Sequence, residues 1–166
     1  MRWTEVEKKF TFNFLPYNKL KFLGKTTIYR KYLCTEPEIR INKRVFQDGE
    51  IRCHIVLKNN LLIKNDFITR EKYKKNISLE EFNILSDMID IPLMIIDNFD
   101  FYLDENHNIC FKCVRGIDIN YMEIEFNKNY DWLIIKDSIY SLGIIDKDVS
   151  NDPNFMMKNV WKKHFI

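Results

Sequence analysis

Alternating apolar and polar residues predict β-strands through the first half of the chain. In the first such segment, strand alternation places Glu5, Glu7 and Lys9 on one face. Two later segments flank the turn sequence Gln47–Glu50, which favours a hairpin. The strands expected in this half are Trp3–Phe12, Thr26–Cys34, Glu38–Phe46, Ile51–Lys58 and Asp66–Lys74.

The second half mixes helical and strand patterns. Ser78–Glu81 is a capping-box sequence, which predicts the start of a helix. The apolar stripe of that helix is expected at Leu79, Phe82, Leu85 and Ile89. Further strands are expected at Leu93–Leu103, Ile109–Val114 and Ile119–Asn127. A short helical turn is expected at Pro16–Phe22, and helices are expected from Tyr130 to Gly143 and after the pair Asp152 and Pro153.

This order of elements contains about eight strands, two or three helices and no alternation of strand and helix. It therefore predicts an α+β fold, a closed eight-stranded antiparallel β-barrel with a few flanking helices. We expect a single domain over residues 1–166, with barrel strands at about 3–127 and a C-terminal helical segment at about 130–166.

Charge is distributed unevenly along the chain. Residues 1–75 contain 18 Lys and Arg against 8 Asp and Glu, whereas residues 76–166 contain 8 against 16. A basic half favours an anionic partner, although a solvated basic face would give the same counts. Because the sequence has no apolar run long enough to span a bilayer and no signal-peptide core, we expect a cytoplasmic protein with no membrane partner. The oligomeric state, monomer or homodimer, stays open.

Paired carboxylates on two strands are the first candidate for chemistry. Glu5 and Glu7 share a face of one strand, and Glu123 and Glu125 share a face of another. Like charges stacked in this way repel unless solvent or a cation neutralises them, and a divalent cation binds carboxylate oxygens well. Basic side chains at alternating strand positions could line the same space and bind phosphate oxygens. These are Arg40, Arg44, Lys58 and Arg70.

The same residues resemble motifs of the CYTH superfamily, the triphosphate tunnel metalloenzymes. The strand sequence Glu5-x-Glu7-x-Lys9 matches the ExExK signature of that family. Four further segments resemble family motifs in the family's order, and they are Tyr32–Ile41, Leu57-Lys58, Ile68–Tyr73 and Met122–Phe126. The resemblance covers residues 1–127.

The resemblance implies a tunnel in which a triphosphate is hydrolysed or cyclised with Mg²⁺ or Mn²⁺. It implies that Glu5, Glu123 and Glu125 hold the cation. Glu7 would bind a second cation or orient the attacking water, and it would form the catalytic pair with Lys9. The implied phosphate-binding residues are Lys9, Arg40, Lys58 and Arg70, to which Arg44 and Lys112 are added as possible replacements for missing family residues.

Three departures from the family pattern bear on activity. Asn42 stands where the family has the second arginine of an RxR pair, and Arg44 on the same face could compensate. The family's KxR pair after the middle helix is missing, because no Lys or Arg occurs between Lys75 and Lys112. Lys112 itself stands where the family has an acid. If Lys112 faces inward it can replace part of the missing positive charge, and if it faces outward one wall lacks cations.

Three functional hypotheses follow. The first is a metal-dependent hydrolase of inorganic tripolyphosphate or of a nucleoside or RNA 5′-triphosphate. The second is a module that binds a triphosphate or nucleotide without turnover. The third is an adenylate cyclase of the class IV type, for which no adenine-binding residues can be named. An RNA 5′-end as partner is possible within the first hypothesis, but no RNA-binding motif supports it.

Overall fold

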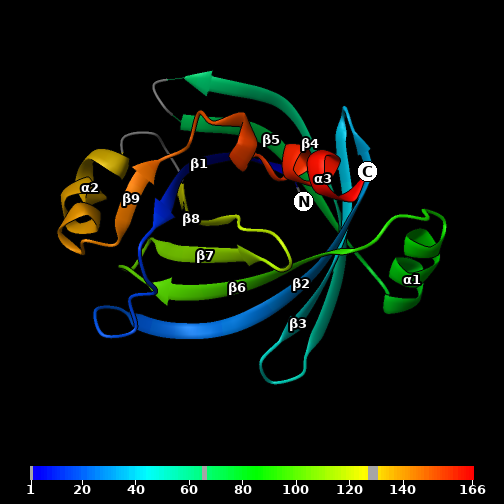
Figure 1. Cartoon of the computed structure of the whole chain (residues 1–166), viewed down its shortest axis with the longest axis horizontal. Coiled ribbons are helices and arrows are strands. Elements are labelled where there is room, and N and C mark those ends of the chain that lie inside the picture. The colour runs from blue at the N-terminus through cyan, green and yellow to red at the C-terminus, as the bar shows by residue number, and fades with distance from the viewer. Residues whose placement is uncertain (1, 65–66, 127–130) are drawn as a thin grey trace.

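One antiparallel sheet of nine strands forms the body of the protein, and eight of them close into a barrel (Figure 1). The computed structural model describes residues 2–64, 67–126 and 131–166, excluding the side chains of residues 60–64. The strand order is β5-β4-β3-β2-β6-β7-β8-β1-β9, and pairing of β1 with β5 closes the ring. The elements are β1 Arg2–Phe12, β2 Lys21–Thr35, β3 Glu38–Phe46, β4 Ile51–Lys64, β5 Phe67–Ile77, α1 Leu79–Asp87, β6 Met94–Tyr102, β7 Asn108–Val114, β8 Asn120–Phe126, α2 Asp131–Ser141, β9 Ile145–Asp148, a 3₁₀ turn Pro153–Phe155 and α3 Met157–Phe165.

Strand β1 joins three neighbours in turn and therefore holds the closure together. Its first half pairs with β5, its middle with β8 and its last residues with β9. The register across the β1–β8 seam sets Glu7 opposite Glu125 and Lys9 opposite Glu123. This register decides which charged side chains can meet inside the barrel.

Both faces of β1 are buried, although only one of them faces the barrel interior. Glu5, Glu7 and Lys9 point inward and are at most 3% exposed. On the outer face, Val6 and Phe10 pack in an apolar cluster with residues of α2, including Trp132. The charged inner face is therefore enclosed by the barrel walls and not by this outer core.

The three helices within the described residues cover different parts of the barrel. Helix α1 packs through Phe82 on the outside of β3 and β4. Helix α2, beside β9, covers the outer face of β1 and β8 (Figure 1). Helix α3 contributes Met157, Val160 and Trp161 to a cluster that includes inward-facing residues of β2 and β6, so it closes one end of the barrel.

The predicted fold class is confirmed, and the main differences lie at the ends of elements. The capping box of Ser78 and Glu81 is present, but Leu79 is 42% exposed and Ile89 lies beyond α1, so the predicted apolar stripe is wrong at both ends. The predicted helical turn that begins at Pro16 is present, because the amides of Lys19 and Leu20 donate to the carbonyl of Pro16, but it ends before Phe22, since β2 begins at Lys21.

At the C-terminal end, Asp152 caps the 3₁₀ turn, and α3 starts only at Met157. Strand β9 was not expected from the sequence. Three predicted boundary residues, Asp66, Asn127 and Tyr130, lie outside the described residues.

No helix in the described part of the chain is both long and apolar enough to cross a membrane.

Candidate functional site

Charged side chains from most of the strands meet inside the barrel. The alternation that turns Glu5 inward on β1 also turns Arg40 inward on β3, Lys58 on β4 and Arg70 on β5, and all four are at most 9% exposed. Such burial is unusual for ionised groups unless they are paired. The interior is therefore a network of ion pairs and not an apolar core.

Three carboxylates form a group that can hold a metal ion. Glu5, Glu7 and Glu125 can each place an oxygen within 4.8 Å of the others. Glu5 and Glu7 are buried, whereas the Glu125 side chain is 56% exposed. Enclosure by the pocket, together with the neighbouring Glu5 and Glu7 carboxylates, raises the pKa of Glu125.

Two lysines neutralise Glu5. Lys58 donates to its Oε2, and Lys72 Nζ lies 2.6 Å from its Oε1. Burial alone would raise the pKa of the Glu5 carboxyl, but the two ammonium groups hold it well below its usual value. Lys72 also approaches Glu125, at 3.8 Å, and so connects the two carboxylates.

Arginines hold the next carboxylates. Arg70 donates to Glu7 Oε1 at 2.9 Å and to Glu38 Oε2 at 3.1 Å, and Arg40 donates to Glu38 Oε1 at 2.8 Å. Burial opposes ionisation of Glu7, yet Lys9, Lys58 and Arg70 keep the pKa of its carboxyl well below the usual value. The second oxygen of Glu7, Oε2, is buried and has no hydrogen-bond partner among the described residues.

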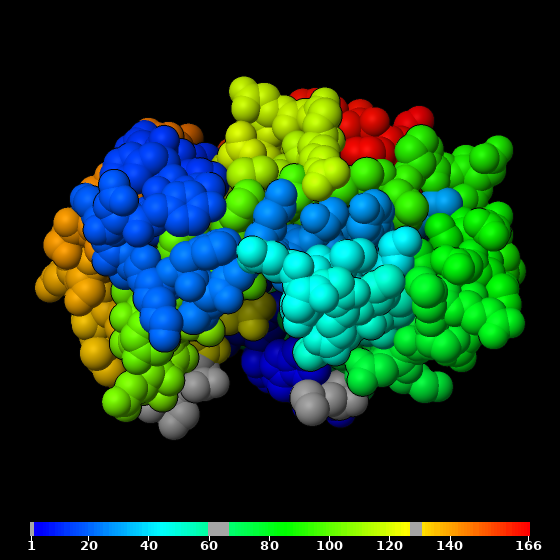
Figure 2. All heavy atoms as spheres, turned by 90° about the horizontal axis from the view of Figure 1, so that it is seen from below, coloured from blue at the N-terminus to red at the C-terminus, as the bar shows by residue number. Residues whose placement is uncertain are grey.

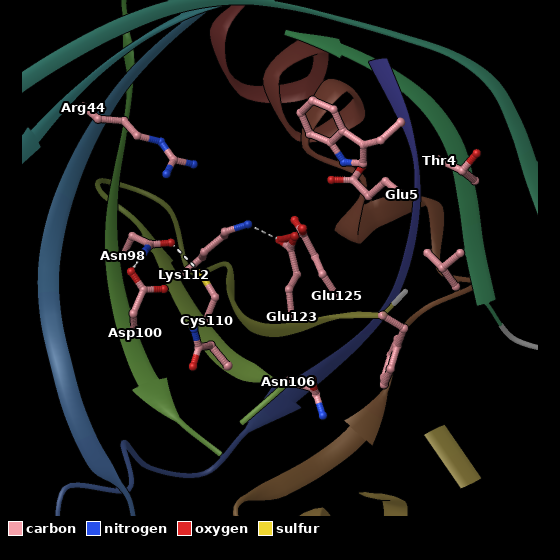
Figure 3. Close-up of a pocket in the computed structure, with 14 residues that line it drawn as sticks. Thr4, Glu5, Arg44, Asn98, Asp100, Asn106, Cys110, Lys112, Glu123 and Glu125 are labelled. Atoms are coloured by element: carbon pink, nitrogen blue, oxygen red, sulfur yellow. Dashed lines mark hydrogen bonds and ion pairs between the residues drawn. The ribbon is translucent and has the colours of Figure 1, made fainter. Parts of the chain in front are cut away.

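The ion pair of Lys112 and Glu123 separates two spaces inside the barrel (Figure 3). Both residues line a mouth pocket of about 410 Å³, and both also line an inner cavity of about 20 Å³. Because Glu123 lies beside it, the pKa of Lys112 is raised despite burial. The inward orientation of Lys112, one of the two alternatives from the sequence, is therefore the one observed.

On the face shown in Figure 2, a hollow lies between β2 (blue) and the β3–β4 hairpin (cyan), where Lys25, Thr26 and Gln47 line a further pocket. Asp100 and Asn108 line both that pocket and the adjoining mouth pocket.

The wall of the mouth pocket opposite Glu5 carries Arg44 and a chain of polar groups on β6 and β7 (Figure 3). Cys110 Sγ donates to Asn98 Oδ1 at 2.6 Å, and Asn98 Nδ2 donates to Asp100 Oδ2 at 2.9 Å. The mouth thus offers amide and carboxylate groups, whereas the inner cavity is mainly basic.

All ten site residues expected from the sequence lie in the barrel interior. Nine line one or both of the two cavities, and Glu7 is buried at 1% exposure beside them. The carboxylates that converge are Glu5, Glu7 and Glu125, whereas the resemblance implies Glu123 in the place of Glu7. The β1–β8 register explains the difference, since it sets Glu123 opposite Lys9 and leaves it to pair with Lys112.

Sequence reasoning missed several interior residues, among them Lys72, which pairs with Glu5, as well as Glu38 and Arg30. Glu38, which holds Arg40 and Arg70, lies two positions before Arg40 on the same strand face, so the alternation could have revealed it. Arg30 on β2 is 4% exposed and lines the inner cavity. Its inward neighbours Ile28 and Tyr32 are apolar or aromatic, which hid it from a search for charged strand faces.

The missing basic wall is filled by apolar packing. Met94 and Ile96, inward on β6, are fully buried and belong to the same cluster as Met157 and Trp161 of α3. These β6 positions, where the family has lysine and arginine, therefore help to close that end of the barrel with apolar side chains.

The carboxylate group fits a hard divalent cation. Mg²⁺ and Mn²⁺ favour carboxylate oxygens, and three such residues converge here. Glu7 Oε2 is a buried acceptor to which no described residue donates a hydrogen bond. Glu5, Glu7 and Glu125 are therefore the residues suited to hold the ion.

Comparisons with known proteins identify the fold. No family model and no curated protein matches the sequence. Solved structures do match. The protein PH1819 of Pyrococcus horikoshii OT3 is 19% identical, covers 96% of this chain and 99% of its own, and has a TM-score of 0.69.

Two further matches are described as triphosphatases. HpAC1 from Hippeastrum, described with a dominant triphosphatase activity, is 10% identical over 94% of this chain and 95% of its own, with a TM-score of 0.62. The inorganic triphosphatase NE1496 is 16% identical over 94% and 93%, with a TM-score of 0.59. At such identities a likeness establishes the fold alone, so this chain has the same barrel fold as these structures.

Proposed function

We propose that this protein is a metal-dependent hydrolase that cleaves a triphosphate inside its barrel. The observation that carries the proposal is the arrangement of the interior, where a three-carboxylate group faces a cavity lined by six basic residues and two acidic ones. A bound cation would neutralise the carboxylates, and a polyanion would neutralise the basic residues of the cavity. The triphosphatases among the structures of the same fold add support at the level of the fold.

The carboxylates would hold the cation through Glu5, Glu7 and Glu125. A bound Mg²⁺ or Mn²⁺ would neutralise charge on the phosphate oxygens and polarise the phosphoryl group that is attacked. Oε2 of Glu7 accepts no hydrogen bond from any residue that the structure describes, so Glu7 can either complete the cation site or accept a hydrogen bond from the attacking water. Both roles are the ones that the resemblance to the family implies for this residue.

The basic residues would bind the phosphate oxygens. Lys58 and Arg70 already face carboxylates, and a phosphoryl group can take the place of those carboxylates as acceptor of charge-assisted hydrogen bonds. Lys9 Nζ lies 3.5 Å from Glu7 Oε1 and is placed to stabilise charge next to the carboxylate group.

Entry of the substrate requires the inner cavity to widen. Its volume of about 20 Å³ is close to that of one water molecule. Lys112 and Glu123 line both cavities, so a phosphoryl group that enters would part this ion pair and take over the lysine. The lysine thereby exchanges one anionic partner for another, and Glu123 keeps the nearby Lys9 as a counter-charge.

A second function, capture of a triphosphate without turnover, is favoured by one observation. Met94 and Ile96 occupy inward positions of β6 with apolar side chains, so that wall supplies no cations to stabilise charge in a transition state.

Phosphate release separates the two functions. Purified protein would be incubated with tripolyphosphate, ATP or thiamine triphosphate, with Mg²⁺, with Mn²⁺ and with a chelator, while calorimetry measures binding in parallel. Hydrolysis predicts metal-dependent phosphate release from at least one compound. Binding of a triphosphate with no release from any of the three would support capture and contradict hydrolysis.

A further inference from the structure

Arg30 is a buried cation that has no ion-pair partner among the described residues. It is 4% exposed. Glu38, whose charge is close enough to favour the protonated guanidinium, already accepts from Arg40 and Arg70. Burial and the neighbouring Arg40 lower the pKa of Arg30. A buried charge without a counterion destabilises a fold, so an anion supplied from outside is the simplest reason for its presence.

The position of Arg30 is fixed by the strand on either side. Its Nε donates to Asn42 Oδ1 at 2.7 Å, and Asn42 is its register partner on β3. On the other side its register partner is Met94 of β6. Asn42 and Met94 are both inward positions that carry no charge, and Arg30 lies between them. One guanidinium therefore serves a stretch of wall where its register partners on both neighbouring strands are uncharged.

The side chain reaches the inner cavity. Arg30 lines it together with Lys58, Arg70 and Lys112, which are already assigned to phosphate. A guanidinium has five N–H donors, and its bond to Asn42 uses the one on Nε, which leaves the two terminal nitrogens free to form a fork that matches phosphate oxygens.

We propose that Arg30 is a further phosphate-binding residue, which contacts the phosphoryl group lying deepest in the barrel, and that Asn42 is its positioning residue. This assignment rests on the proposed binding of a triphosphate and names one more group in the same site.

The first test measures tripolyphosphate affinity by calorimetry for wild type, Arg30→Met and Arg52→Met. Arg52 is an exposed arginine on β4 paired with Glu50, so its variant controls for the loss of an arginine as such. We expect Arg30→Met to weaken binding roughly tenfold to hundredfold and Arg52→Met to leave it unchanged. Equal affinity of Arg30→Met and wild type would overturn the assignment.

A second measurement distinguishes a ligand-binding role from a structural one. Without ligand, Arg30→Met should melt at the same temperature as wild type or higher, because it removes an unbalanced buried charge. The double variant Arg30→Asn with Asn42→Arg moves the guanidinium from β2 to the opposite position on β3. It should recover most of the affinity for tripolyphosphate that Arg30→Met loses. A lower melting temperature of Arg30→Met, with no recovery in the exchange variant, would mean that Arg30 is structural.

The two proposals fail in different ways. If wild type neither binds nor cleaves any triphosphate, the proposed function is wrong, and the role of Arg30 is wrong with it. If wild type binds tripolyphosphate and Arg30→Met binds it equally well, only the role of Arg30 is wrong.

Discussion

At the scale of single residues, the interior is governed by how each buried charge finds its partner. Glu5 is held by two lysines, and Glu123 by Lys112. Breaking one such pair leaves the other charge buried and unsatisfied, which costs more than the pair itself contributes. Substitutions here therefore act on stability and on ligand binding together, and each needs a test that separates the two.

Lys112 offers such a test, because one substitution removes its positive charge and another replaces it with a negative charge. Lys112→Ala should weaken tripolyphosphate binding by about 1.5–3 kcal/mol, the range for a charge-assisted hydrogen bond. Lys112→Asp should weaken it further, since it places a second carboxylate beside Glu123. Calorimetry measures both, and Lys21→Ala, an exposed lysine at the start of β2, is the control. Wild-type affinity in both Lys112 variants would show that this lysine does not meet the ligand.

His54 makes a prediction about pH. It is 4% exposed, and burial together with Lys74, Arg44, Arg30 and Arg40 lowers its pKa from 6.5 to about 3. Between these values the unfolded chain binds a proton that the folded chain does not, so the free energy of unfolding falls as pH drops below 6.5. The loss approaches about 1.4 kcal/mol per pH unit.

Urea denaturation between pH 7 and pH 5 measures this slope, in a range above the usual carboxyl pKa of 4.5. His54→Gln should flatten it relative to wild type, and His164→Gln, which removes an exposed histidine, should not. Identical slopes for wild type and His54→Gln would show that His54 is not held neutral.

At the scale of elements, strand periodicity explains what could be predicted and what could not. A period of two fixes which side chains share a face, so the inward set Arg40, Lys58 and Arg70 could be named from the sequence. The register between β1 and β8 is set by closure of the barrel. Because of this register, Glu7 belongs to the observed carboxylate group, where Glu123 was predicted. Closure of one end by α3 packs Trp161 against Tyr32, 129 positions earlier in the chain, and no local pattern encodes it.

The carboxylate group at the β1–β8 seam predicts a response to metal. Mn²⁺ should raise the melting temperature of wild type, because a ligand that binds only the folded state stabilises it, by about 2.7 kcal/mol at a hundredfold excess over Kd. Glu125→Gln should remove most of this gain and is the variant least disruptive to folding, since Glu125 is half-exposed. Glu105→Gln, an exposed loop carboxylate, is the control. An unchanged gain in Glu125→Gln would place the metal elsewhere.

Helix α3 predicts a large effect on stability. Trp161 is 4% exposed and packs against Tyr32 with ring centroids 5.3 Å apart, so it anchors the helix to the closed end of the barrel. Trp161→Ala should lower the free energy of unfolding by about 3–5 kcal/mol. Urea denaturation measures it, with the adjacent exposed Lys162→Ala as control. A loss as small as that of the control would mean that α3 does not close the barrel in solution.

At the scale of the whole molecule, the barrel separates two environments along one passage. The mouth is open, with amide and carboxylate groups on one wall, and the inner cavity is basic and closed by α3. A triphosphate that enters would meet the carboxylate group first and the densest positive charge last. The charge asymmetry of the sequence follows from this design, because β1–β5 carry most of the basic side chains and β6–β8 complete the wall with few.

The central claim, metal-dependent cleavage of a triphosphate within the barrel, is tested most directly by phosphate release from tripolyphosphate with Mn²⁺. Wild type, Arg70→Gln and Arg52→Gln would be assayed side by side, after circular dichroism has shown that all three are folded. We predict release by wild type that a chelator abolishes, a loss of about tenfold or more in Arg70→Gln, and full activity in Arg52→Gln. Absence of metal-dependent release by wild type, or equal release by Arg70→Gln, would contradict the claim.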